Sequence, residues 1–317
     1  MENRKITTEY KLKFSANCIV QTERKEWLTE NNDRVRTRQH LNLRNNSTRG
    51  QLSKKSKAKM KKAINWLVIA SEKKKAFNLK VNKHFNFKIN FITLTIPPQE
   101  KGLISEKEFK SVLNTWLTYH RTYSKLNNYV WKIEKHKDNR LHIHIVSDTF
   151  INWKKIRNSW NLILQRGGFL EYHFAKFGNY DPNSTDVHST QKVKKLAAYM
   201  VKYLAKSNAA DPLFNGRVWS CSLKLSKVIN NELIITPDRI GEILRPLFDK
   251  KIEHKLIETE PNAFGNKFAV ADLYLLRVKD WLKLEGSFIF DHFRELIWFL
   301  RPENNRYRYK QLSLIID

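Results

Sequence analysis

Residues 131–146 read W-K-I-E-K-H-K-D-N-R-L-H-I-H-I-V, and this stretch decides the fold that the sequence predicts. Two segments of alternating apolar and polar residues flank a polar tip, Lys137-Asp138-Asn139, which is the pattern of a β-hairpin. In the second segment His142 and His144 are two residues apart, so both imidazoles leave the same face of the sheet. The aliphatic residues between and beside them then point into a core.

A hairpin centred on Asp138 places Glu134 directly opposite His142. Directly opposed residues of antiparallel strands have Cβ atoms about 5 Å apart. Two imidazoles and one carboxylate therefore converge, and the sequence predicts a metal site made of Glu134, His142 and His144. The alternative is that the histidines are ordinary strand residues and Glu134 faces solvent, because short His-x-His patterns have a high rate of false positives.

A second chemical pattern lies at residues 199–206, Y-M-V-K-Y-L-A-K. At helical spacing Tyr199 and Tyr203 lie side by side, on the flank of an apolar stripe that faces the sheet. Lys195, Lys202 and Lys206 lie farther round the same helix. The stripe consists of Val193, Ala197, Met200 and Leu204. The alternative is that both tyrosines only pack.

These patterns together resemble the HUH endonucleases: a His-apolar-His strand, an acidic residue eight positions before the first histidine, and a later Tyr-x-x-x-Tyr helix with interleaved lysines. Among them the chain looks most similar to the rolling-circle replication initiators of microvirus-type phages and bacterial plasmids. The segment Phe91-Ile-Thr-Leu-Thr-Ile-Pro-Pro98 resembles the strand that opens the catalytic domain of that family. The resemblance runs from near Lys88 to near Leu225.

The resemblance implies a metal-dependent endonuclease and strand transferase that nicks single-stranded or hairpin origin DNA and keeps a 5′-phosphotyrosine bond. Tyr199 and Tyr203 are then the nucleophiles. A phenol has a pKa near 10, so Lys202, Lys206 or the metal would have to favour the phenolate or stabilise the transition state. If only one phenol attacks, Tyr203 is expected, because it lies nearer the apolar stripe.

Two imidazoles and a carboxylate do not select one ion, because imidazole accepts Zn, Cu or Ni whereas phosphate and water favour Mg or Mn. The resemblance implies Mg²⁺ or Mn²⁺. Asp186 and His188, just before the tyrosine helix, are candidate secondary ligands, although a loop aspartate and a lone histidine are more often structural. His136 is expected at the exposed hairpin tip.

Composition points to a polyanionic partner. The 317 residues include 59 Lys and Arg against 31 Asp and Glu, a formal charge of +28. Aromatic residues make up 12%, which excludes a disordered basic tail. With Cys18 and Cys221 alone, a disulfide framework and a cysteine zinc site are excluded, as suits a reducing cytoplasm, here that of a bacterial host.

The charged start, Met1 to Lys11, predicts no signal peptide, and the apolar stretch 287–300 is too short and too charged to span a membrane. No G-x-x-x-x-G-K-[ST] phosphate loop occurs, so ATP hydrolysis is not expected. Strand separation would come from a host helicase, with a host polymerase extending the 3′-OH.

A lysine block enters the apolar run Ile64 to Ala70, which predicts one basic helix over 53–76 with Ile64, Leu67 and Val68 on one face. We expect phosphate contacts from this helix and from Lys195. The alternative is a solvated, lysine-coated helix. The helix lysines expected to bind DNA are Lys54, Lys55, Lys57, Lys59, Lys61 and Lys62.

The remaining patterns predict a strand over 86–96 that stops at Pro97-Pro98, and two helices that begin at Ser105 and Asn152. Further strands are expected over 169–174 and 217–225, with a polar loop over 178–186. Together they predict an α+β domain, residues 86–225, built on a mainly antiparallel five-stranded sheet with helices on one side. Residues 1–85 and 226–317 are expected to be basic, partly helical and mostly helical extensions, respectively.

Two other functions fit the same residues. A transposase or relaxase of the same superfamily would share the active site and differ in its DNA substrate. A non-enzymatic, basic DNA-binding regulator with a structural metal would bind DNA without ever becoming covalently attached to it.

Overall fold

A computed structural model describes residues 6–27, 52–78, 82–99, 104–135, 140–190, 217–244, 252–258, 269–277 and 281–301. The chain divides into two compact units. The central unit consists of residues 48–226 and 297–317, and the terminal unit of residues 1–47 and 227–296.

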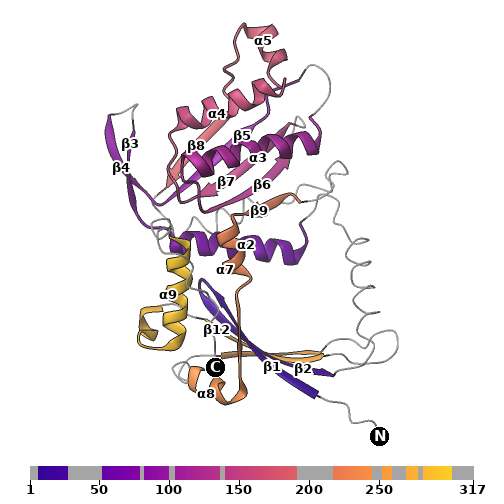
Figure 1. Cartoon of the computed structure of the whole chain (residues 1–317), viewed down its shortest axis with the longest axis vertical. Helices are drawn as coiled ribbons and strands as arrows, with labels where there is room; N and C mark the ends of the chain where they lie inside the picture. Colours follow the sequence, from indigo (N-terminus) through magenta and orange to yellow (C-terminus); the bar gives the residue numbers. More distant parts are fainter. Residues whose placement is uncertain are drawn as a thin grey trace. The chain divides into compact units, whose positions relative to one another are not determined.

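The central unit contains a five-stranded sheet in the order β8-β5-β7-β6-β9, and every neighbouring pair is antiparallel (Figure 1). The α+β class and the antiparallel sheet predicted from the sequence are confirmed. The strands are β5 (Ile89–Thr95), β6 (Tyr129–Lys135), β7 (Leu141–Ser147), β8 (Thr185–Thr190) and β9 (Trp219–Cys221).

The pairing of β6 with β7 is the predicted one, with Glu134 directly opposite His142. On the other face of β7, Ile143 and Ile145 are fully buried, as the alternation predicts. Strand β7 lies between β5 and β6, so each histidine has a directly opposed residue on both sides. The hairpin tip, residues 136–139, lies outside the described residues.

Helices α3 (Glu106–Tyr123) and α4 (Trp153–Arg166) lie on one face of this sheet (Figure 1). The predicted capping box is present, with the Ser105 side chain accepting from the Glu108 backbone N–H and the Glu108 carboxylate accepting from Ser105 N–H. Asn152 caps α4 through Lys154 N–H, and Gly167 ends it. The core of this layer includes Phe109, Leu113, Trp116, Ile156 and Trp160.

A third helix, α2 (Lys54–Ala70), contacts β6 and β9. The indole Nε1 of Trp219 donates to Ser56 Oγ of this helix over 2.6 Å, and Trp219 is paired with Lys132. Paired residues share a sheet face, and Lys132 shares its face with the histidines. Helix α2 therefore packs on the side opposite to α3 and α4, and the expectation of helices on one side only is wrong.

The predicted basic helix over 53–76 is too long at its C-terminal end. It stops at Ala70, and Lys74–Asn78 form β3, which pairs with β4 (Lys83–Phe87) in a separate two-stranded sheet. Pairing with a partner strand overrides the weak helical preference of a lysine run. The predicted strand over 86–96 is interrupted at Lys88, between β4 and β5.

Three short elements differ from the sequence-based expectation. Residues 171–177 form helix α5 (Glu171–Phe177) rather than a strand, and Gly178 ends it with a φ of 69°. A short apolar run has no periodicity that separates the two choices. The end of the expected polar loop belongs to β8, and β9 is three residues long, followed by α7 (Leu223–Ile229).

The terminal unit has its own five-stranded antiparallel sheet, in the order β10-β1-β2-β12-β11. The expectation of purely helical extensions is therefore wrong, and the two ends of the chain share one sheet. In β1 the buried Leu12 and Phe14 alternate with half-buried Lys11 and Lys13, and these charged neighbours obscure the strand pattern in the sequence. The boundaries predicted at residues 85 and 225 stay a prediction.

The strands of this unit are β1 (Ile6–Ser15), β2 (Cys18–Trp27), β10 (Glu232–Ile235), β11 (Ile252–Glu258) and β12 (Ala269–Arg277). Its helical elements are α8 (Pro237–Leu244), the 3₁₀ turn η2 (Trp281–Leu284) and the larger part of α9 (Phe288–Leu300). Within the described ranges, none of the helices has the length and apolar character needed to cross a membrane.

Candidate active site

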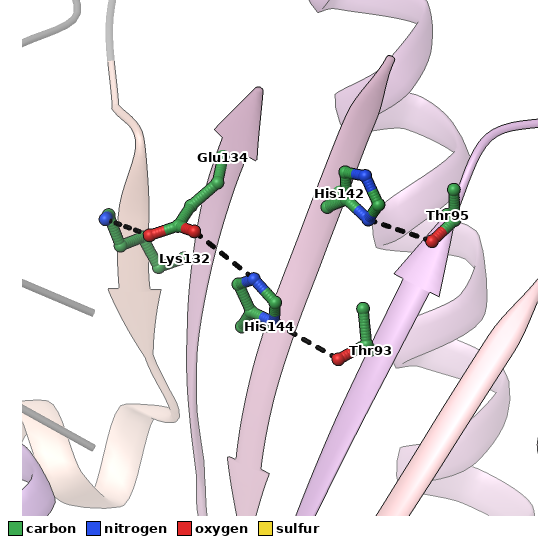
Figure 2. A network of polar contacts seen from close by, with 6 residues as sticks. All are labelled: Thr93, Thr95, Lys132, Glu134, His142 and His144. Carbon is green, nitrogen blue, oxygen red and sulfur yellow. Dashed lines mark hydrogen bonds and ion pairs between the residues drawn. The ribbon is translucent and has the colours of Figure 1, made fainter. Parts of the chain in front are cut away.

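Both histidines lie on the sheet face opposite to α3 and α4, in a row of polar contacts that crosses three strands (Figure 2). His144 is at the centre of this row. Its Nε2 lies 3.3 Å from Glu134 Oε2, and its Nδ1 shares a 3.1 Å hydrogen bond with Thr93 Oγ1 of β5. The imidazole of His144 is thereby held at both nitrogens.

His142 is oriented in the same way by the next threonine. Its Nδ1 shares a 2.9 Å hydrogen bond with Thr95 Oγ1, and its ring is nearly parallel to that of His144, with 6.4 Å between centroids. Each threonine is the directly opposed residue of the histidine that it contacts. Sequence reasoning missed this role, although the Thr-x-Thr of β5 repeats the His-x-His of β7 with the same period.

Lys132 is the second residue that sequence reasoning missed. It is directly opposed to His144, it is 5% exposed, and its Nζ contacts Glu134 Oε1. Burial lowers the pKa of Lys132, and the hydrogen bond with Glu134 partly offsets this effect. The signal in the sequence is the spacing Lys-x-Glu, which places a cation beside the carboxylate on one face.

Lys132 explains why Glu134 does not point where its register alone suggests. Glu134 is opposite His142, yet its carboxylate leans along the strand towards Lys132 and contacts His144, the diagonal neighbour. Burial raises the pKa of Glu134, but hydrogen bonds from His144 and Lys132 outweigh it and hold the pKa below its ordinary value of 4.5. The carboxylate is therefore charged at neutral pH.

The chemistry of these donors fits a divalent cation. Metal-ligating histidines almost always use one ring nitrogen for the metal and hold the other by a hydrogen bond, as the threonines hold Nδ1 of His142 and His144. In the part of the chain that the structure describes, however, no three His, Cys, Asp or Glu side chains are grouped closely enough to bind a metal. The structure joins Glu134 to His144 and leaves His142 beside them, so the metal assignment stays a prediction.

Asp186 and His188 lie on β8 rather than in a loop. Asp186 is directly opposed to Thr93, so both residues lie on the same sheet face as the histidines. Their side chains are 64% and 70% exposed, and Asp186 Oδ2 lies 2.8 Å from His188 Nε2. Their role as secondary ligands is a prediction.

The predicted tyrosine helix lies outside the described residues, and so do Tyr199, Tyr203, Lys195, Lys202 and Lys206, as well as His136. Their catalytic and DNA-binding roles are therefore predictions from the sequence.

The lysines of α2 are described in part. Lys55, Lys59 and Lys61 are exposed, and Lys57 and Lys62 are half-buried. The charge of Lys57 contributes to the lowered pKa of Lys132, which places the first turn of α2 beside the site. Lys54 is the first residue of the helix.

Residues 89–208 match a family model of replication-associated proteins, the ORF2 type. The matched segment covers less than half of the chain. It begins at β5 and includes the histidine face and both tyrosines of the predicted helix. No curated protein and no solved structure matches the chain. The match supports a replication initiator of the rolling-circle kind and, with it, DNA as the partner.

We predict that Lys132→Met raises the pKa of Glu134 in the metal-free protein, because it removes a cation that bonds the carboxylate. Carboxyl ¹³C shifts followed over a pH titration measure this change. The folded-state pKa of Glu134 lies below its ordinary value, so this group stabilises the fold above about pH 4.5 and loses that contribution as pH falls.

The matched control is Lys135→Met, which removes the same charge from the same strand on the opposite face and should leave the pKa of Glu134 nearly unchanged. Equal shifts in both variants would contradict a direct ion pair.

Proposed function

We propose that the protein initiates rolling-circle replication by nicking single-stranded origin DNA through a metal-dependent tyrosine transesterification. The observation that carries this proposal is the register of β5, β7 and β6, which places His142, His144 and Glu134 on one sheet face. The match over residues 89–208 supports it independently, since that segment joins this face to the tyrosine helix.

Glu134, His142 and His144 would hold Mg²⁺ or Mn²⁺, which as a Lewis acid would neutralise charge on a non-bridging oxygen of the scissile phosphate. Thr93 and Thr95 keep the imidazoles oriented, so that little order has to be gained when DNA binds. Residues whose rotamers are already fixed by hydrogen bonds hold a reacting group with the required accuracy.

Tyr199 or Tyr203 would supply the nucleophile. The phenolate oxygen attacks the scissile phosphorus, the bond from phosphorus to the 3′ oxygen breaks, and the released oxygen takes a proton to become the 3′-OH. Lys202 and Lys206 would favour the phenolate and stabilise the extra charge of the pentavalent transition state. The 5′-phosphotyrosine bond conserves the energy needed to rejoin strands.

Two tyrosines suit the two cleavages of rolling-circle replication, one that starts it and one that releases the finished circle. After the first, one phenol is esterified to DNA and cannot attack again. A second phenol one helical turn away, about 5.4 Å along the axis, could reach the same phosphate. We infer that Tyr199 and Tyr203 alternate.

The lysines of α2 would bind the DNA backbone. Exposed lysines begin at the first turn of this helix, beside Lys132, so a strand lying along α2 would lead to the histidine face. Such contacts are sequence-independent and depend strongly on salt. A host helicase and polymerase would complete the replication cycle.

We predict that His142→Ala abolishes covalent attachment of the protein to labelled single-stranded DNA on a denaturing gel, and that EDTA does the same for the unaltered chain. DNA affinity, measured by fluorescence anisotropy, should stay within a few-fold, because it rests on phosphate contacts. His173→Ala, on the separate helix α5, is the control and should attach normally. Full attachment in EDTA would refute the metal, and no attachment under any condition would favour a non-enzymatic regulator.

We further predict that Tyr199→Phe and Tyr203→Phe each retain one round of nicking and attachment, and that only the double variant loses both. The measurement is repeated cleavage and rejoining of a labelled origin strand. One single variant that is fully inactive, beside another that is fully active through repeated cycles, would refute alternation and identify a single nucleophile.

A further inference from the structure

Strands β3 and β4 form a two-stranded ribbon that extends away from the central sheet (Figure 1). Both strands belong to the central unit, and they pair from Lys74↔Phe87 to Asn78↔Lys83. The residues between them, 79–81, lie outside the described residues. Because directly opposed residues of a pair share a face, the register assigns every side chain of the ribbon to one of two faces.

One face anchors the ribbon to the rest of the unit. The rings of Phe85 and Phe87 lie 5.6 and 5.5 Å from that of Phe150, measured between centroids. The Nζ of Lys74 donates to the backbone oxygen of Asp148 over 3.1 Å. This face therefore fixes how the ribbon projects.

The opposite face is exposed along the described length of the ribbon. It carries Lys75 and Phe77 from β3, opposed to Asn86 and His84 from β4, and all four side chains are exposed. Phe77 and His84 contact each other edge to face, with 5.0 Å between ring centroids. Phe77 is 37% exposed, which is unusual for phenylalanine and requires an explanation.

Charge identifies the kind of partner. The ten residues of β3 and β4 include Lys74, Lys75 and Lys83 and no Asp or Glu. The acidic residue just before the ribbon, Glu72, is already bonded by Arg301, with 2.8 Å between Oε1 and Nη2. The exposed face is thus complementary to a polyanion rather than to an acid-poor protein surface or a second copy of this basic chain.

Size and side-chain chemistry identify the form of DNA. The major groove of duplex DNA is about 12 Å wide and admits a two-stranded β-ribbon. In that groove, lysine bonds guanine, asparagine bonds adenine, and an apolar side chain contacts the thymine methyl group. Lys75, Asn86 and Phe77 supply one group of each kind on a single face.

We propose that this ribbon face, Lys75, Phe77, His84 and Asn86, reads the major groove of duplex DNA beside the nicking site. The inference rests on the proposed function for the identity of its substrate, such as the stem of a hairpin origin. It assigns sequence recognition to a part of the protein that is separate from the histidine face. Strand cleavage and origin recognition are then carried by different side chains.

The test is selection of binders from a pool of DNA hairpins with a randomised stem, in EDTA so that nicking plays no part. The unaltered chain should enrich one stem sequence. The double variant Lys75→Met with Asn86→Ala should lose about tenfold or more of the preference at the positions that these residues read. Lys83→Met is the matched control, because it removes one exposed lysine of the same ribbon from the other face, and it should keep the preference.

Unchanged thermal unfolding would show that the variants are folded. Equal preference in the double variant and the unaltered chain, or equal loss in Lys83→Met, would overturn the assignment. Sedimentation without DNA is the second measurement, and a dimer that only the double variant dissociates would assign the face to a second copy instead. Binding of hairpins without any dependence on the ribbon would leave the proposed nickase intact, whereas no binding at all would overturn both.

Discussion

The candidate site depends on one constraint, the antiparallel register of β5, β7 and β6. This register forms two rows across the sheet, Thr93–His144–Lys132 and Thr95–His142–Glu134, all on one face. A slip of one residue in any of the three strands would send its side chains to the opposite face, among the aliphatic core residues. The buried Ile143 and Ile145 oppose such a slip, so the packing of the core fixes the position of the chemistry.

Much of this could be predicted from the sequence, because a hairpin with strict alternation has one sensible register. Glu134 opposite His142 follows from it, and so do the capping box of α3 and the end of α4 at Gly167. The direction of the Glu134 carboxylate could not be predicted, since it depends on Lys132 being buried beside it under α2 and β9. A one-dimensional pattern places Cβ atoms but not the ends of long side chains.

The elements that the sequence misplaced share a physical cause. Strand β1 alternates aliphatic residues with lysines, and its partners come from the other end of the chain, so no local signal marks them. Helix α5 and strand β3 are short, and tertiary packing decides their state. The same pairing of β3 with β4 converts part of a lysine run into an exposed, two-faced ribbon. Cations thereby lie on both a helix and a ribbon of the unit that carries the histidines.

The most direct test of this account is a Mn²⁺ titration of the protein followed by NMR of its histidine side chains. The account predicts that ring resonances of His142 and His144 broaden first and that Glu134→Gln removes this preference. His120, buried under α3 on the other side of the sheet with a pKa lowered to about 4 by burial, should stay sharp. If His142 and His144 stay as sharp as His120, or broaden equally in Glu134→Gln, the sheet face is not a metal site.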